Sequence, residues 1–104
     1  MIVEQRTYTL HPGKLQEMLD VYTAEGMETH RRILGNQLGY FYTEIGPLNQ
    51  VVHMYGYESL DDRARRRAEL AADPTWQAYI KKGVTYFQDM ESKILLPTSF
   101  SPIR

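Results

Sequence analysis

Two neighbouring segments rich in tyrosine, valine and phenylalanine constrain the fold of this chain more than any other feature. They run from Leu38 to Ile45 and from Gln50 to Glu58, with Gly46-Pro47-Leu48-Asn49 between them. Aromatic and β-branched residues favour strands, whereas glycine, proline and asparagine favour tight turns. The pattern therefore predicts an antiparallel β-hairpin.

A further strand and a long helix are predicted before the hairpin. Residues alternate between two faces from Ile2 to Leu10, which is typical of a strand. We expect Pro12 to lie in the first turn of the helix that follows, and apolar residues at helical spacing extend that helix to Ile33. Gly26 costs up to about 1 kcal/mol relative to alanine inside a helix. It therefore predicts a kink or a close contact with another element.

Two helices and a last strand are predicted after the hairpin. Ser59 and Asp73 are good N-cap residues, and a helical segment follows each of them. Evenly spaced apolar residues predict the last strand at Val84, Tyr86, Met90 and Ile94. The resulting order is βαββαβ, that of the ferredoxin-like fold in the α+β class, with an antiparallel sheet and helices on one face. We expect residues 1–104 to form this single domain.

The composition excludes several classes of protein. Twelve Lys and Arg against 13 Asp and Glu leave a net charge of −1, so we expect no nucleic-acid partner. No apolar run approaches the ~18 residues of a membrane span, so we expect no membrane partner. The first residues lack a secretion-signal pattern and the chain has no cysteine, which together favour a cytoplasmic protein.

The sequence carries no common catalytic or cofactor motif. It has no P-loop, no glycine-rich nucleotide fingerprint and no Gly-x-Ser-x-Gly sequence. The three histidines, His11, His30 and His53, are not spaced as metal ligands, so we expect neither a metal nor a cofactor. His30 lies on the inner stripe of the first helix, where we favour a hydrogen-bonded core histidine over a pocket residue. An arginine cluster from Arg63 to Arg67 favours a solvated or interface helix over an anion site.

Tyrosines, an arginine and a histidine share faces within the predicted strands, and on the assumption that these faces align across the sheet they line one surface. These candidate ligand-binding residues are Arg6, Tyr8, Tyr40, Tyr42, His53, Tyr55 and Tyr57. One interpretation is a pocket in which Arg6 holds a carboxylate or enolate and His53 acts as an acid or base. The other is a tyrosine-rich core or dimer interface. The residues leave both open, and they leave open whether any reaction is catalysed.

Several segments resemble the NIPSNAP family over nearly the whole chain. They are Glu44-Ile45-Gly46-Pro47-Leu48-Asn49-Gln50-Val51-Val52-His53, Ser59 to Arg67, Arg6 to Leu10 with Pro12-Gly13, Ala72-Asp73-Pro74-x-Trp76, and Leu96-Pro97 with Phe100-Ser101-Pro102. The resemblance implies a dimeric α+β barrel in which two ferredoxin-like sheets pack face to face, and it supplies no catalytic residues. Animal members are associated with mitochondria and carry a targeting segment and more domain sequence. We expect this chain to be a short, bacterial-type member.

A homodimer is also expected from the sequence pattern itself. Phe41, Ile45, Val52 and Met54 are apolar and have the opposite parity to the tyrosines, so they would leave an apolar face uncovered. A second copy related by a two-fold axis is the simplest cover, and the tail after Pro97 is a candidate arm across that partner. Two functions follow as hypotheses. The first is a small-molecule-binding dimer with oxygenase-like or isomerase-like activity, and the second is a non-enzymatic scaffold or protein-interaction module.

Overall fold

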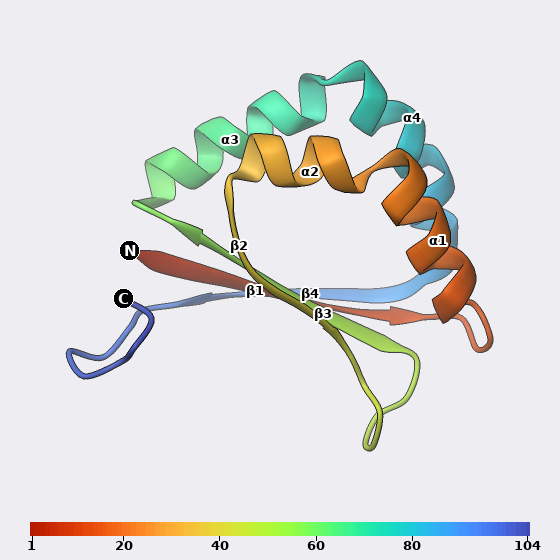
Figure 1. Cartoon of the computed structure of the whole chain (residues 1–104), viewed down its shortest axis with the longest axis horizontal. Coiled ribbons are helices and arrows are strands. Elements are labelled where there is room, and N and C mark those ends of the chain that lie inside the picture. Colours follow the sequence, from red (N-terminus) through yellow and green to blue (C-terminus); the bar gives the residue numbers. More distant parts are fainter.

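The structure, a computed structural model that describes residues 1–104, has a four-stranded antiparallel sheet with a layer of helices on one face (Figure 1). The strands are β1 (Ile2–Leu10), β2 (Asn36–Tyr42), β3 (Gln50–Tyr57) and β4 (Phe87–Leu95). Their order in the sheet is β2-β3-β1-β4, and every pairing is antiparallel. This confirms the predicted α+β, ferredoxin-like arrangement and its hairpin. The first strand of the hairpin ends at Tyr42 rather than at Ile45, so Ile45 lies in the loop and not on the open face of the sheet.

The helix layer consists of four α-helices and one short 3₁₀ turn. They are α1 (Leu15–Glu25), α2 (Met27–Leu34), α3 (Leu60–Ala72), α4 (Pro74–Gly83) and η1 (Val84–Tyr86). All of them lie on the same side of the sheet, so its other face carries no helix (Figure 1). None of the helices is both long and apolar enough to cross a membrane.

The first predicted helix is divided at Gly26, which confirms the predicted kink and corrects the single long helix. A side-chain carbon at Gly26 would lie only 2.8 Å from two ring carbons of Tyr79 in α4. Only glycine therefore allows the α1–α2 junction to approach α4 this closely. The expectation that Pro12 begins the helix is wrong. Gly13 has φ +79°, a left-handed conformation that breaks the helix, and α1 starts at Leu15.

Both predicted N-caps are confirmed. The Ser59 hydroxyl accepts a hydrogen bond from the Asp62 backbone N–H at 3.1 Å, which satisfies a free donor at the start of α3. The Asp73 carboxylate accepts one from the Trp76 backbone N–H at 3.0 Å and starts α4. Asp73 is extended, as residues before proline usually are, so α3 ends there and α4 begins in a new direction.

The last strand begins later than predicted. Val84 keeps helical backbone angles, and residues 84–86 form the 3₁₀ turn η1. Pairing with β1 starts only at Phe87, which lies opposite Leu10. Val84 and Tyr86 therefore belong to the end of the helix layer. The prediction placed them in the strand because the even spacing of apolar residues continues across the end of the helix.

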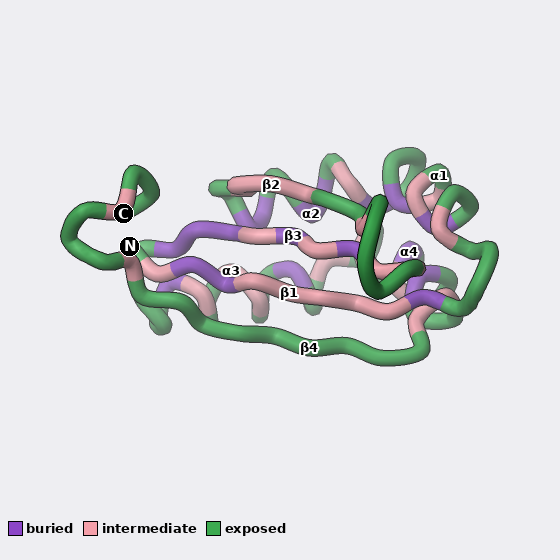
Figure 2. Tube along the Cα trace, turned by 90° about the horizontal axis from the view of Figure 1, so that it is seen from below, coloured by how far each residue is buried: buried purple, intermediate pink, exposed green.

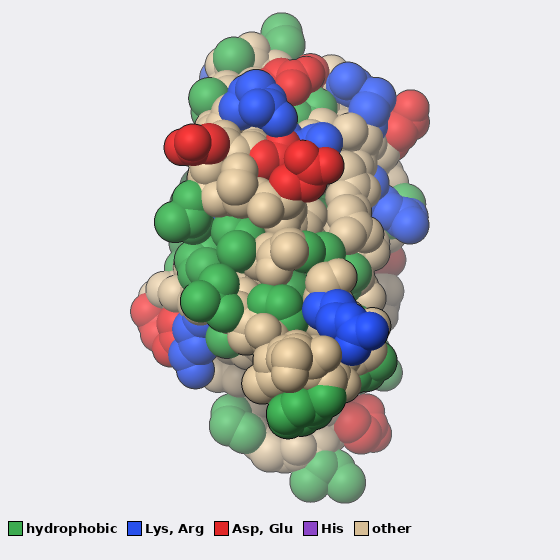
Figure 3. All heavy atoms as spheres, turned by 90° about the vertical axis from the view of Figure 1, so that its left-hand side faces the viewer, with side chains coloured by type: hydrophobic (Ala, Val, Ile, Leu, Met, Phe, Trp, Pro, Cys, Tyr) green, Lys and Arg blue, Asp and Glu red, His purple; other side chains and the backbone are tan.

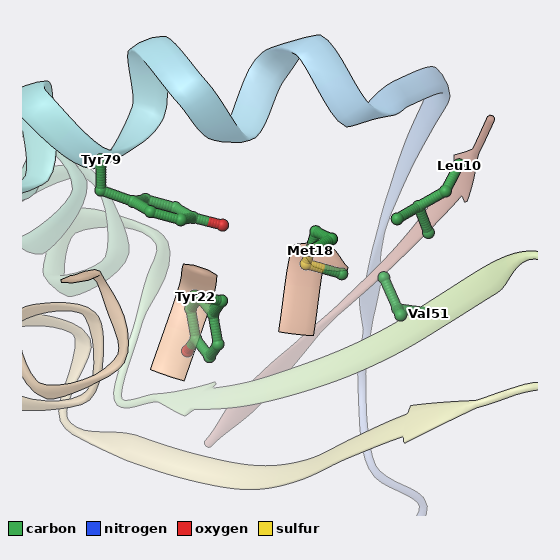
Figure 4. Packing of buried hydrophobic residues seen from close by; sticks show 5 residues of the cluster. All are labelled: Leu10, Met18, Tyr22, Val51 and Tyr79. Atoms are coloured by element: carbon green, nitrogen blue, oxygen red, sulfur yellow. The ribbon is translucent and has the colours of Figure 1, made fainter. Parts of the chain in front are cut away.

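The core between sheet and helices has two parts. The first contains Leu10, Met18, Tyr22, Val51 and Tyr79, and Figure 4 shows these side chains converging from β1, β3, α1 and α4. The second contains Ile33, Leu34, Tyr55, Tyr57 and Leu70. Trp76 packs against both parts. In the sheet, β1 and β3 contain the buried residues and β4 is largely exposed (Figure 2).

Candidate functional site

Three adjacent strands, β2, β3 and β1, place a row of polar and aromatic side chains under the helices. His53 of β3 lies directly opposite Arg6 of β1 and Tyr40 of β2. Residues opposite each other in an antiparallel pair share a face, so these three side chains point to the same side of the sheet. The expected alignment of faces across the strands is thus present. A register shift between Gln37 and Gly39 also brings Gln37 onto this face, opposite Tyr55.

A cavity of about 220 Å³ lies above this row, between the sheet and the helices. Tyr22 and Tyr79 of the first core part and Leu70 of the second all line it, so it lies between the two parts of the core. Val84 and Met90 also line it and are half exposed, which places its opening beside β4. The sheet and helices therefore enclose a space with aromatic walls and an open side.

Four of the seven candidate residues line this cavity: Arg6, Tyr8, Tyr40 and His53. Tyr55 and Tyr57 share the same face of β3 but lie in the second core part, beyond the cavity wall. Tyr42 is 56% exposed at the end of β2 and lies outside the cavity. Alternation within a strand predicts which face of the sheet a residue lies on, but not how far along the strand the cavity extends. The sequence therefore could not show that Tyr42, Tyr55 and Tyr57 lie outside the cavity.

The helices contribute cavity residues that were not selected from the sequence. They are Tyr22, His30, Arg67, Leu70, Trp76, Tyr79 and Ile80. The sequence does contain a signal for two of these residues. Arg67 and Leu70 follow Arg63 at helical spacing, so the three side chains share one face of α3. His30 fulfils both interpretations considered for it, because it is a hydrogen-bonded core residue that also lines the cavity.

His53 has an unusual environment for a buried polar residue. Its side chain is almost fully buried, at 2% exposure, and neither ring nitrogen has a hydrogen-bond partner. The ring stacks on Tyr40, with centroids 4.9 Å apart, and meets the edge of Tyr8 at 5.0 Å. Burial, followed by the positive charge of Arg6, lowers the pKa of His53 to about 3. His53 is therefore a neutral imidazole with unused hydrogen-bonding capacity beside the cavity.

His30 contrasts with His53 because its Nδ1 is well satisfied. The hydroxyl oxygens of Tyr22 and Tyr55 lie 2.7 and 2.9 Å from Nδ1, and the Gln37 amide donates to Tyr55 at 2.9 Å. Nδ1 is therefore within hydrogen-bond distance of two hydroxyl groups, one of which also accepts a hydrogen bond from Gln37. Burial is the main cause that lowers the pKa of His30 to about 3, and the positive charges of Arg67 and Arg6 act in the same direction.

The His30 ring is also fixed by stacking. It lies on Trp76 with ring centroids 4.5 Å apart and an interplanar angle of 11°. Its centroid is 5.9 Å from that of His53. Two neutral imidazoles from different elements, α2 and β3, therefore border the same cavity.

A buried carboxylate organises the positive charges next to the cavity. Glu4 accepts hydrogen bonds on Oε2 from Arg63 at 2.7 Å, Ser92 at 2.6 Å and Arg6 at 3.0 Å. Arg67 lies 4.0 Å from the other carboxylate oxygen. Burial alone would raise the pKa of Glu4, but these hydrogen bonds and the charges of Arg6 and Arg63 lower it to about 2. Glu4 is thus an anion that positions arginines.

The remaining arginines of α3 are paired within the helix. Arg65 and Arg66 both contact the Asp62 carboxylate, at 2.6 and 3.0 Å. Asp62 is buried, and its two pairs reduce the free positive charge of the helix. Arg66 also donates from Nη1 to the Ile33 carbonyl at 3.1 Å. Arg67 differs because it forms no hydrogen bond within the chain and lines the cavity. No group of three or more His, Asp or Glu side chains is placed to hold a metal ion.

The geometry defines a class of protein: a ferredoxin-like α+β domain with an aromatic cavity between its sheet and its helices. A sequence model of the NIPSNAP family matches residues 3–102. The chain therefore belongs to the NIPSNAP family, which confirms the resemblance seen in its motifs. A NipSnap homologue from Dictyostelium discoideum is 37% identical over 94 residues, covering 90% of this chain and 41% of that protein.

Human NipSnap homologue 3A is 32% identical over 104 residues, covering 99% of this chain and 42% of the human protein. The chain thus spans less than half of the length of these curated relatives. A solved NIPSNAP family protein from Agrobacterium tumefaciens has 53% identity and a TM-score of 0.97, with 99% of this chain and 98% of that chain covered. A NIPSNAP-like domain protein from Burkholderia xenovorans has 54% identity and a TM-score of 0.93, covering 97% and 88%.

The fold extends beyond the family. A putative antibiotic biosynthesis monooxygenase from Nitrosomonas europaea superposes with a TM-score of 0.68 at 10% identity, covering 93% of this chain and 98% of that chain. At this identity the likeness shows a shared fold alone.

Proposed function

We propose that this domain binds a small molecule in the cavity between its sheet and its helices. The observation that carries the proposal is His53, which is buried beside the cavity with both ring nitrogens unpartnered. Leaving a buried polar group without a hydrogen bond costs about 1–3 kcal/mol, so such groups are rare unless they serve another purpose. A ligand that hydrogen-bonds to His53 removes this cost.

The aromatic walls set the shape of the ligand. Tyr40, Trp76 and Tyr79 present ring surfaces to the cavity, which suits a flat apolar group. A cavity of roughly 150 Å³ is known to hold benzene, so 220 Å³ accommodates one ring with a polar substituent. The proposed ligand is a single-ring compound that fits between these aromatic side chains.

The low basicity of His53 favours binding over proton transfer in the empty site. A general base works best when its pKa lies near the working pH, whereas burial and Arg6 lower the pKa of His53 to about 3. An oxygenase-like or isomerase-like reaction that begins with removal of a proton from the substrate needs a stronger base than this. Binding is therefore the function that this geometry supports best.

A probe pair tests the proposal. Phenol donates a hydrogen bond and toluene does not, so phenol is expected to bind more tightly, and Trp76, the only tryptophan, reports binding through its fluorescence. His53→Phe keeps a ring on Tyr40 but removes both nitrogens, and we expect it to weaken phenol binding about tenfold, or about 1.4 kcal/mol. His11→Gln, at an exposed residue, is the matched control. Equal binding of phenol to the wild type and His53→Phe would contradict the proposal.

We also propose that the domain forms a homodimer through the face of the sheet that carries no helix. Phe41, Val52 and Met54 lie on this face, and Phe41 is 54% exposed. Exposed apolar residues on one sheet face favour burial against a second copy. The alternative function, a scaffold that binds another protein, is supported by Ile45 and Leu48, which are exposed in the loop between β2 and β3.

A further inference from the structure

We infer that the ligand of this cavity is an organic anion, a single-ring carboxylate or a similar acid, bound by Arg67 and Arg6. This inference rests on the proposed function and adds the chemical class of the ligand. Arg6 and Arg67 are the charged side chains that line the cavity, and no acidic residue lines it. The charged side chains that line the cavity are thus all positive.

The nearby carboxylate does not neutralise these arginines. Three guanidinium groups, those of Arg6, Arg63 and Arg67, surround the single carboxylate of Glu4, which leaves an excess of two positive charges. Both Arg63 and Arg6 are committed to Glu4 by hydrogen bonds of 2.7 and 3.0 Å. Glu4 is 1% exposed and stays ionised, so this arrangement persists at neutral pH.

Arg67 has the free capacity to bind an anion. Its nearest carboxylate oxygen on Glu4 is 4.0 Å away, beyond hydrogen-bond distance, and it has no other acceptor within the chain. Arg6 donates from Nε to Tyr8 and from Nη1 to Glu4, which leaves Nη2 without a partner. Guanidinium groups bind carboxylates through paired, charge-assisted hydrogen bonds. These two side chains come from α3 and β1, so an anion between them also joins the helix layer to the sheet.

The uncharged part of the ligand faces different groups. His53 offers unpartnered nitrogens, and the ring of His30 also lines the cavity. Neutral imidazoles neither repel nor strongly attract an anion, so the arginines determine its orientation. The acid group is expected at the arginines and the ring between Tyr40, Trp76 and Tyr79.

Benzoate and benzamide test the inference, because they share one ring and nearly the same shape but differ in charge. Measured through Trp76 fluorescence and by calorimetry on the full chain, benzoate is expected to bind about tenfold more tightly than benzamide. Arg67→Gln is expected to weaken benzoate binding more than benzamide binding and so to reduce this preference, while Arg6 remains. Arg65→Gln is the matched control, since Arg65 is on the same helix, largely exposed and outside the cavity.

Each result has a defined meaning. Equal binding of benzoate and benzamide overturns the inference that the ligand is an anion, but it does not contradict the proposed small-molecule site. An equal effect of Arg67→Gln and Arg65→Gln also overturns the inference, because the preference then reflects general surface charge. Failure of benzoate, benzamide and phenol alike to bind overturns both the inference and the proposed function.

Discussion

His30 and His53 are two buried imidazoles only 5.9 Å apart, yet their hydrogen bonding is opposite. Tyr22 and Tyr55 satisfy Nδ1 of His30, whereas neither nitrogen of His53 has a partner. Alternation within a strand was sufficient to place His53, Tyr55 and Tyr57 on one face of their strand. That this face also carries Arg6 was assumed from the sequence, and the pairing of β1 with β3 confirms it. The sequence was insufficient to find the partners of His30, since these come from α1 and β3 and depend on packing.

Acidification is predicted to destabilise the fold through both histidines. The pKa of each falls from 6.5 to about 3 on folding, so protonation favours the unfolded chain once the pH falls below 6.5. At pH 5 the expected loss is about 2 kcal/mol for each histidine relative to pH 7. Glu4 acts in the same direction at lower pH, because its stabilising effect is lost between its unfolded pKa of 4.5 and about 2. Urea unfolding at a series of pH values measures these losses.

The His53→Phe variant separates the two contributions. It is expected to lose about half as much stability between pH 7 and pH 5 as the wild type, because only His30 then titrates. His11→Gln is expected to keep the full loss, since His11 is exposed. An unchanged pH profile in His53→Phe would mean that His53 is not buried as a neutral ring.

Within single elements, the sequence correctly predicted the features that depend on neighbouring residues. Ser59 and Asp73 each accept a hydrogen bond from the backbone N–H three residues later. Because this contact is local, the starts of α3 and α4 could be predicted from the sequence. The start of β4 was not predicted correctly, because the end of a helix and the start of pairing with β1 depend on residues distant in sequence. The register shift near Leu38 was missed for the same reason.

Gly26→Ala tests the contact between the α1–α2 junction and α4. Alanine favours helix by up to about 1 kcal/mol, but its methyl carbon would lie 2.8 Å from the buried ring of Tyr79. Overpacking of this kind costs about 1–3 kcal/mol, so we expect a net loss of stability. Thr23→Ala, exposed on the same helix, is the control and is expected to cause no loss in urea unfolding. A stabilised Gly26→Ala variant would show that Tyr79 moves aside easily.

The whole molecule is asymmetric, with helices on one face of the sheet and none on the other. Figure 3 shows the end that carries both termini, where charges of both signs mix in the helix layer and hydrophobic side chains gather below. There Leu96 and Ile103 of the tail line a groove with Val3 and Met54 of the open sheet face. The tail therefore lies beside its own sheet, and its proposed contact with a partner chain remains a prediction.

Light scattering with size-exclusion chromatography tests the proposed dimer. The expected mass is twice the 12.2 kDa of one chain. Phe41→Glu places a charge on the open face and is expected to give a monomer, because an unpaired charge is costly in an apolar interface. Leu60→Glu, an equally exposed site at the start of α3 in the helix layer, is expected to remain a dimer. A wild-type monomer would contradict the dimer.

The central claim, that a ring-shaped ligand binds beside His53, is tested most directly by NMR of the imidazole nitrogens in nitrogen-labelled protein. The chain has three histidines, and two of them, His30 and His53, line the cavity whereas His11 is exposed. On addition of phenol, we predict that the signals of His53 shift most, those of His30 shift less and those of His11 stay in place. Shifts confined to His11, or none at all, would contradict the proposed site.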